Sequence, residues 1–297
     1  MIISGLDTSK AADQLSLLFD IEAIFKRRGR LVLAYEDDEK LLFDPSDSQA
    51  CESCYQALSS NSFRRIVGLV ANSEAPLSFE AIQSECTDLT ESKVQSQLAR
   101  AVDLCMIRSS TEAYEPVSTV GFGSTFEWYV AAVCIEELAS ISYWGVQVED
   151  LSGDYDVVVI RENQLGYIEC KTGRFSNITG EDVKNSLVRA SVLGSNFTIF
   201  LVDQISRENV DVLARYALEQ EDSYRFEVPG GSILFKEESY RNFVRIMPIN
   251  TFILSVADRS VGVALKEIYQ FLTLVPGRAL PSMENEAAKE QFGLLNR

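Results

Sequence analysis

The spacing of apolar residues changes along the chain and divides it into three regions. Residues 1–61 contain the helical pattern Leu15–Phe25 and then two short apolar runs on either side of the acidic segment Glu36–Glu39, which predict a β-hairpin. Residues 62–118 carry mainly helical spacing, and residues 119–297 alternate between helical and strand spacing. The pattern predicts an α/β fold preceded by a smaller α+β region.

The region 62–118 is predicted to hold three helices and a two-stranded wing. Phe63–Ala71 has apolar residues at helical spacing, Ser78 can cap a short helix, and Thr90 opens a longer one. Met106–Val117 then fits a pair of short strands. This order resembles a winged helix-turn-helix, in which the second and third helices contact DNA. The predicted third helix has few basic residues, so we favour docking or dimerisation over DNA binding for this region.

The third region begins at Gly121–Gly123. Its core, residues 121–203, predicts a helix, three strands, a helix and a strand. Thr179 and Asp182 form a capping box that opens the second of these helices. Further along, the pattern predicts a helix at Ser206–Glu219, a strand at Gly231–Phe235, an amphipathic helix at Val261–Phe271 and a polar, loose end at Ser282–Arg297.

Two neighbouring strands of this core carry most of the candidate chemistry. They are GDYDVVVI (153–160) and LGYIECKTG (165–173), and the short polar turn between them predicts a hairpin. Because side chains alternate between the faces of a strand, we expect Asp156 on one face and Tyr155 on the other face with Val157.

The register of this hairpin decides which charged residues meet. If the turn centres on Glu162-Asn163, Asp156 lies opposite Glu169, and if it centres one residue later, Asp156 lies opposite Lys171. Either register gathers two carboxylates and one ammonium group at the strand ends.

Charges in a buried sheet cost several kcal/mol each unless they are paired or bind a metal. The hairpin has more acids than its single lysine can pair with. Glu127 adds another carboxylate, because Val130, Ala131 and Cys134 place it on the apolar face of its helix. An excess of carboxylates suits a divalent cation, and oxygen ligands without histidine favour Mg²⁺ or Mn²⁺ over Zn²⁺.

Composition removes several classes of function. The chain has 297 residues, of which 46% are hydrophobic, so it can bury a substantial core. It contains no histidine, which excludes Ser-His-Asp and Cys-His catalysis and zinc sites built from histidine. The formal charge of −17 argues against nucleic-acid binding by general positive charge. The Cys51–Cys54 pair stands alone and lacks the ligands for a zinc site.

Neither a membrane segment nor a targeting segment is visible in this sequence. No apolar run approaches the roughly 18 residues of a membrane span. The first residues do not show the basic and then apolar order of a signal peptide. We therefore expect a cytoplasmic protein that does not bind membranes.

The order of an inward glutamate on a helix, an aspartate on a strand and E-x-K on the next strand resembles the PD-(D/E)XK nuclease superfamily, which has the restriction-endonuclease-like fold. The resemblance covers about residues 121–203, and its motif looks most like the nuclease domain of CARF-linked CRISPR ancillary and defence nucleases. Tyr155 stands where the family has a leading proline. The segment 1–61 is too short for a CARF sensor, so activation by a cyclic oligonucleotide is not implied.

The resemblance implies a metal-dependent endonuclease of a defence or restriction system that hydrolyses phosphodiester bonds, with DNA rather than RNA as substrate. Asp156 and Glu169 would ligate Mg²⁺ or Mn²⁺ together with the backbone carbonyl of Cys170. Glu127 would complete or extend this site. Lys171 would orient or deprotonate the attacking water.

Residues around the motif extend this hypothesis. Lys184, Asn185 and Arg189 lie on the polar side of the following helix and could contact the substrate backbone, with an ordinary surface role as the open alternative. Asp154 is expected to lie one pleat away from the metal. Cutting both strands takes two sites, so we expect a homodimer, and the acidic charge favours targeting by a partner protein. The alternative function is an inactive nuclease-like scaffold that binds DNA or protein through its winged helix.

Overall fold

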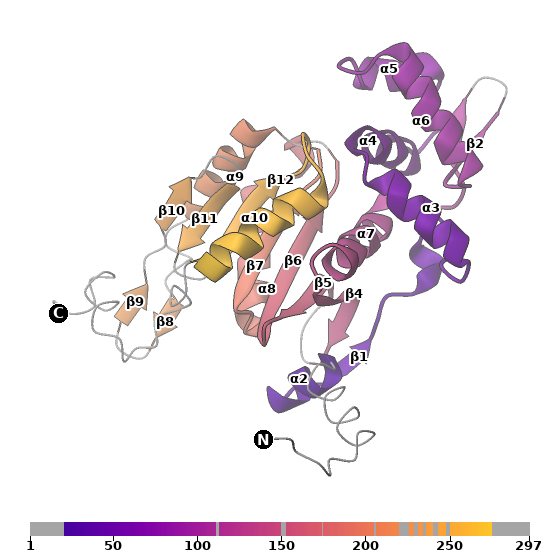
Figure 1. Ribbon diagram of the computed structural model, residues 1–297. Helices are drawn as coiled ribbons and strands as arrows, with labels where there is room; N and C mark the ends of the chain where they lie inside the picture. Colours follow the sequence, from indigo (N-terminus) through magenta and orange to yellow (C-terminus); the bar gives the residue numbers. More distant parts are fainter. Residues whose placement is uncertain are drawn as a thin grey trace, which may run out of the picture.

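The computed structural model describes residues 21–110, 113–149, 153–173, 175–204, 206–219, 226–228, 231–233, 236–239, 243–247 and 250–274. Within these residues a mixed eight-stranded sheet lies between layers of helices (Figure 1). The expected mixed sheet flanked by helices is therefore confirmed. The predicted polar end Ser282–Arg297 lies outside the described residues.

The strand order is β1-β4-β5-β6-β7-β12-β11-β10. Strands β6, β7 and β12 run parallel to one another, and the other neighbours in the sheet are antiparallel. The bounds are β1 (Val32–Ala34), β4 (Ile141–Val148), β5 (Asp154–Arg161), β6 (Gln164–Lys171), β7 (Phe197–Val202), β10 (Lys236–Ser239), β11 (Phe243–Met247) and β12 (Thr251–Ser255). Every residue of β7 is buried, and five of its six residues are apolar, as expected of a strand covered on both faces.

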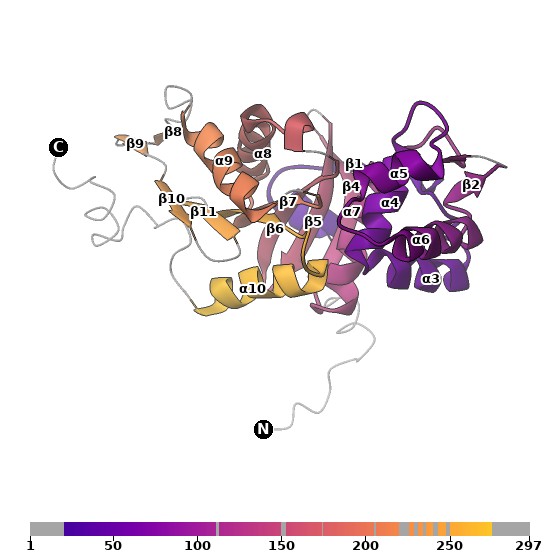
Figure 2. The same ribbon diagram turned by 90° about the horizontal axis from the view of Figure 1, so that it is seen from above.

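Helices cover both faces of the sheet (Figure 2). Apolar residues of α7 (Phe122–Glu136) and α10 (Val261–Leu274) share a core with one face, which we call the α7 face. Apolar residues of α8 (Gly180–Leu193), α9 (Arg207–Glu219) and α2 (Ile21–Arg27) pack on the other, the α8 face. No helix of the described residues is both long and apolar enough to cross a membrane.

Several local predictions in the second half of the chain are confirmed. The capping box opens α8, whose last turn is closed by Gly194 with a φ of 68°. The predicted helices appear as α9 and α10, and the predicted short strand is β9 (Gly231–Ile233), which pairs with β8 (Phe226–Val228). A 3₁₀ turn at Phe175–Asn177 links β6 to α8.

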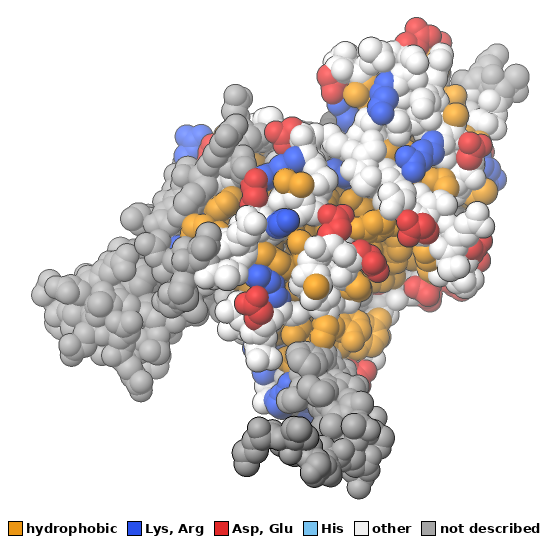
Figure 3. All heavy atoms as spheres, in the orientation of Figure 1, with side chains coloured by type: hydrophobic (Ala, Val, Ile, Leu, Met, Phe, Trp, Pro, Cys, Tyr) orange, Lys and Arg blue, Asp and Glu red, His pale blue; other side chains and the backbone are white. Residues whose placement is uncertain are grey.

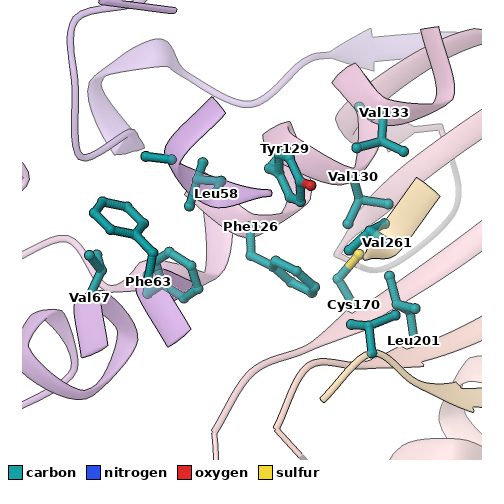
Figure 4. Packing of buried hydrophobic residues seen from close by; sticks show 14 of the residues in the cluster. Leu58, Phe63, Val67, Phe126, Tyr129, Val130, Val133, Cys170, Leu201 and Val261 are labelled. Atoms are coloured by element: carbon teal, nitrogen blue, oxygen red, sulfur yellow. The ribbon is translucent and has the colours of Figure 1, made fainter. Parts of the chain in front are cut away.

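Between β1 and α7 the described residues form four α-helices and a two-stranded sheet. They are α3 (Ser48–Leu58), α4 (Asn61–Ala71), α5 (Phe79–Glu85), α6 (Glu91–Asp103), β2 (Ile107–Ser109) and β3 (Tyr114–Pro116). We call residues 61–116 the helical region. Its apolar core continues into that of the α7 face, because Phe63 and Val67 belong to the same buried cluster as Phe126 and Leu201 (Figure 4).

The hairpin predicted around Glu36–Glu39 is wrong. Strand β1 pairs with β4 at the edge of the large sheet, and a 3₁₀ turn at Asp38–Lys40 follows it. The second apolar run, Leu41–Phe43, is buried instead of forming a strand, and the Leu42 N–H donates to Thr125 Oγ1 of α7 at 3.0 Å. The first apolar run pairs with β4 and the second contacts α7, and the local pattern does not indicate either of these distant partners.

Candidate active site

The hairpin of β5 and β6 adopts the first of the two expected registers. Glu162 and Asn163 have φ values of 48° and 63°, as a two-residue type I′ turn requires. The ladder ends with Val157 opposite Ile168, and one further position in this register would put Asp156 opposite Glu169. The charge of Glu169 acts on Asp156, so the two carboxylates lie near each other where β5 begins and β6 ends.

Asp156 lies at a break in the alternation of two strands. The ladder between β4 and β5 pairs Trp144 with Val157 and Val146 with Tyr155, and it skips the positions of Gly145 and Asp156 between them. On one side of this break Trp144 and Val157 pack on the α7 face, whereas Val146 and Tyr155 pack on the α8 face. The expectation that Tyr155 shares a face with Val157 is therefore wrong, because both strands change face at this point.

Gly145 makes this break possible. Its φ is +57°, a left-handed conformation that favours glycine. A Cβ at this position would lie 2.0 Å from Glu36 Cβ, so the segment after β1 crosses directly over Gly145. Glu36 is thereby almost fully buried, with 6% of its side chain exposed, and it forms an ion pair of 2.5 Å with Lys40. Glu36 and Lys40 were not among the predicted site residues, because the acidic segment Glu36–Glu39 was predicted to be the exposed turn of a hairpin.

Both oxygens of the Glu169 carboxylate have partners. Lys171 Nζ lies 2.7 Å from Oε1, and the hydroxyl of Tyr167 donates to Oε2. Burial by itself would lower the pKa of Lys171, but the charge of Glu169 and their hydrogen bond outweigh it and raise this pKa. Lys171 is thus held as an ammonium ion beside a buried carboxylate.

Asp156 has one oxygen engaged with the backbone of β6. The Cys170 N–H donates to Asp156 Oδ2 at 2.8 Å, while the Cys170 side chain is buried in the core of the α7 face. Burial, and then the negative charge of Glu169, raise the pKa of Asp156 above its usual range. The carboxylate lacks enough nearby positive charge to offset its burial.

Glu127 joins this group from α7. As expected from the spacing of Val130, Ala131 and Cys134, those neighbours are buried. Burial raises the pKa of Glu127 well above its usual range, and the charges of Asp156 and then Asp154 add to the rise. Three elements therefore direct carboxylates toward one another. Asp154 contributes charge here from the first position of β5.

The three expected substrate contacts on α8 do not lie together. Asn185 is exposed, and Lys184 is within 3.4 Å of Glu181. Arg189 turns inward, with its guanidinium carbon 4.8 Å from the ring centre of Tyr155 and 5.7 Å from that of Tyr167. Its Nε and Nη2 are buried without a hydrogen-bond partner in the part of the chain that the structure describes.

Arg189 and the two tyrosines form a support beneath Glu169 that sequence reasoning missed. Burial would lower the pKa of Arg189, but Tyr167 and Glu169 raise it overall. Tyr167 shares a strand face with Glu169 by simple alternation, so its place could have been recognised from the sequence. The inward direction of the Arg189 side chain could not be recognised from the sequence, because Arg189 packs on Tyr155 and the change of face at Tyr155 was not predicted.

The donor types suit a hard divalent cation, although no complete cluster is formed. Burial raises the pKa of Glu127 and of Asp156, and a divalent cation bound beside them would favour their ionised forms. Among the described residues, however, no three Asp, Glu, Cys or His side chains stand together in a way that could hold a metal ion. For Glu169 to become a ligand, Lys171 would have to move from Oε1.

A second buried charged group lies close by, and we call it the junction. Arg64 of α4 donates through Nε to Asp203 Oδ1 at 2.7 Å, and both side chains are at most 1% exposed. Arg64 also donates to the carbonyls of Leu58 and Val256, at 2.8 and 3.2 Å. The Asp203 N–H donates to the Lys171 carbonyl at 3.0 Å, which ties the helical region to the end of β6.

A cleft of about 1130 Å³ separates the helical region from the loops that follow β6 and β7. It starts beside the site, because Thr172 and Gly173 line it directly after Lys171. Among the described residues its charged lining comprises Arg64, Arg65, Glu85, Asp88, Asp203 and Asp258. Acids outnumber bases in this described lining, which does not have the character of a basic groove for a phosphate backbone.

Comparisons with known proteins assign no family. No protein-family pattern and no curated protein matches the chain. The structure of protein VC1899 from Vibrio cholerae resembles it at 13% identity and a TM-score of 0.48, over 86% of this chain and 61% of that one. The structure of Can2 from Sulfobacillus thermosulfidooxidans in complex with cyclic tetra-adenylate does so at 14% identity and a TM-score of 0.39, over 66% and 54%. This chain thus spans less than two thirds of either protein, and scores this low support no inference about activity.

Proposed function

We propose that this protein is a metal-dependent nuclease of the PD-(D/E)XK type that hydrolyses phosphodiester bonds, with DNA rather than RNA as substrate. The observation that carries the proposal is the hairpin that brings Asp156 to the end of β6, where Glu169 and Lys171 form an ion pair. Glu127 approaches this point from α7. An ion pair needs only one acid and one base, whereas this group has an excess of acids, which suits a cation.

In this proposal each residue has a defined task. Asp156, through its oxygen not bound by Cys170 N–H, and Glu169 would hold Mg²⁺ or Mn²⁺ together with the Cys170 carbonyl, and Glu127 would complete or extend the set. A bound ion would lower the pKa of a water molecule and polarise the phosphate. Lys171, released from Glu169, would orient or deprotonate that water. Tyr167 and Arg189 would keep Glu169 in place.

Substrate affinity is expected to be weak. The chain has a net charge of −17, and the cleft beside the site is acidic on balance. Cleavage by the isolated protein should therefore be slow and strongly salt-sensitive. We propose that a partner protein, or a second copy that cuts the other strand, supplies the remaining affinity in the cytoplasm, as part of a defence or restriction system.

The test is a cleavage assay on plasmid, linear duplex DNA, single-stranded DNA and RNA, with Mg²⁺, Mn²⁺ or EDTA. We expect cleavage only with a divalent ion, and a loss of roughly 100-fold or more in Lys171→Ala. Lys266→Ala is the matched control, because Lys266 is an exposed lysine on α10. Cleavage that persists in EDTA, or in Lys171→Ala at the rate of the control, would contradict the proposal.

A scaffold without activity is the second candidate. It is favoured by the Lys171–Glu169 ion pair, which occupies a ligand oxygen, and by the lack of a complete acidic cluster among the described residues. The helical region, with its winged-helix order, would then bind DNA or protein. Calorimetry would detect no Mn²⁺ binding, while gel-shift assays would detect DNA binding that Lys93→Glu on α6 weakens.

A further inference from the structure

The sheet edge at β1 presents an exposed apolar row. Leu31, Leu33 and Tyr35 are 51%, 64% and 40% exposed. Ile135 of α7 is 47% exposed and lies in the wall of an adjoining hollow. Single exposed apolar residues are ordinary on protein surfaces, but a contiguous set of large ones marks an interaction site.

The hollow has a volume of about 630 Å³ and an aromatic lining. Tyr35 packs on Tyr143 with ring centres 5.6 Å apart, and Trp128, which lines the hollow, is held edge-on by Phe43 at 4.7 Å. Trp144 also contributes to the wall. Figure 3 shows apolar side chains gathered where Figure 1 places α7, β4 and β1, with acidic side chains among them. We call the row and this cavity the β1 hollow.

The backbone of β1 offers a second kind of contact. Strand β1 pairs with β4 on one side and ends the strand order of the sheet. Within the described residues no strand covers its other side. An extended segment of another chain can add to such an edge by main-chain hydrogen bonds, while alternate side chains enter adjoining pockets.

Charge selects the occupant. Asp37 and Asp38 line the hollow and are exposed, and Glu39 follows them. No Lys or Arg is among the described residues that line it, and the nearby Lys40 is bound to Glu36. A second copy of this chain would bring another charge of −17 to an acidic rim. A basic partner would gain attraction at the same place.

We propose that the β1 hollow binds an extended segment of a partner protein in which apolar or aromatic side chains alternate with Lys or Arg. The segment pairs with β1, its apolar side chains fill the aromatic hollow, and its basic side chains face Asp37 and Asp38. This interaction is independent of nuclease activity, because none of these residues belongs to the carboxylate site.

The experiment selects short random peptides, displayed on phage, against the immobilised full-length chain. Counter-selection uses Leu33→Asp, which changes an exposed side chain and should leave the fold intact, as circular dichroism can check. Val263→Asp is the matched control, because Val263 is 52% exposed on α10, away from β1. We expect enriched peptides to alternate apolar and basic residues and to lack proline at alternate positions.

A synthetic enriched peptide should bind the wild type and Val263→Asp equally. It should bind Leu33→Asp about tenfold more weakly than the wild type. It should also bind Asp38→Lys more weakly than the wild type, and this second difference should be larger at low salt than at high salt. Enrichment of acidic or uncharged peptides, or equal binding to Leu33→Asp, would overturn the proposal. Sedimentation velocity is the second measurement, and a wild-type dimer that Leu33→Asp abolishes would assign the surface to a second copy instead.

Discussion

The carboxylate site and the junction both bury charge at the ends of neighbouring strands, yet they are balanced differently. At the junction one arginine meets one aspartate, and the guanidinium also finds backbone carbonyls of Leu58 and Val256. At the carboxylate site Lys171 pairs with Glu169, and burial together with neighbouring carboxylates raises the pKa of Asp156 and of Glu127. Burial raises the pKa of Asp203 too, but there Arg64 acts against the rise and no like charge among the described residues adds to it. A buried ion pair needs one acid and one base, and the excess of acids at the carboxylate site is the observation on which the proposed cation site rests.

Removing one partner of the junction should have the largest effect on stability. In Asp203→Ala the Arg64 guanidinium stays buried without its counter-charge, so we expect the free energy of unfolding to fall by about 3–5 kcal/mol. Urea denaturation followed by circular dichroism measures it. The double variant Arg64→Met/Asp203→Leu is the control and should recover much of the loss, because it removes both charges. A single variant as stable as the wild type would show that the junction is not a balanced pair.

Gly145→Ala tests the crossing of the two segments at the carboxylate site. The new Cβ meets Glu36 Cβ and the residue must keep a positive φ, so we expect a loss of roughly 1–3 kcal/mol in thermal or urea unfolding. Gly153→Ala is a matched control, because Gly153 also has a positive φ, of 77°, but nothing within 4 Å of the added Cβ. If both variants lose the same stability, the contact with Glu36 has no energetic role.

Glu127→Gln should stabilise the protein when no metal is present. Burial, and then the charges of Asp156 and Asp154, raise the pKa of Glu127 to about 9, so at neutral pH folding has to protonate a carboxyl that is ionised in the unfolded chain. Gln avoids this cost, so we expect a gain of about 1 kcal/mol in EDTA at neutral pH. Thermal unfolding with EDTA and with Mg²⁺ measures it, and Mg²⁺ should stabilise the wild type more than the variant. A loss of stability in EDTA would mean that Glu127 has a stabilising partner at this site.

Asp88→Asn should have the smallest effect. Arg65 and Asp88 form an ion pair of 2.5 Å, but 63% of the Asp88 side chain is exposed. Exposed pairs contribute about 0–1 kcal/mol and weaken with salt, so the expected loss lies in that range and shrinks at high ionic strength. A loss as large as that of Asp203→Ala would contradict the view that burial makes the Arg64–Asp203 pair more stabilising than the exposed Arg65–Asp88 pair.

Much of the site could be predicted because it lies on one local hairpin. The alternation of side chains and the length of the turn limited the hairpin to two possible registers. The observed register has its turn at Glu162-Asn163, and both residues have the positive φ values that such a turn requires. The place of Glu127 followed from helical spacing. Tyr155 was misplaced because alternation assumes an unbroken strand, and the break depends on Gly145 of the neighbouring strand.

Other parts depended on contacts between distant segments. The acidic run Glu36–Glu39 had the composition of a turn, but its first residue is buried over Gly145 by the pairing of β1 with β4. Strands β11 and β12 were not predicted, although β12 is a parallel neighbour of β7. Short apolar runs do not indicate which strand they will join, since sheet partners are chosen by burial across the whole fold.

The sequence by itself determined the mixed α/β class, the hairpin, the capping of α8 and the carriers of the candidate chemistry. These follow from backbone periodicity and from residue types, which act over a few positions. Only the tertiary structure decided that β4 and β5 change face at Asp156, that Glu36 is buried over Gly145, and that Arg64 meets Asp203. Such contacts arise because a buried charge needs a partner, which can lie far away in the chain, and because a left-handed glycine lets a distant segment approach closely.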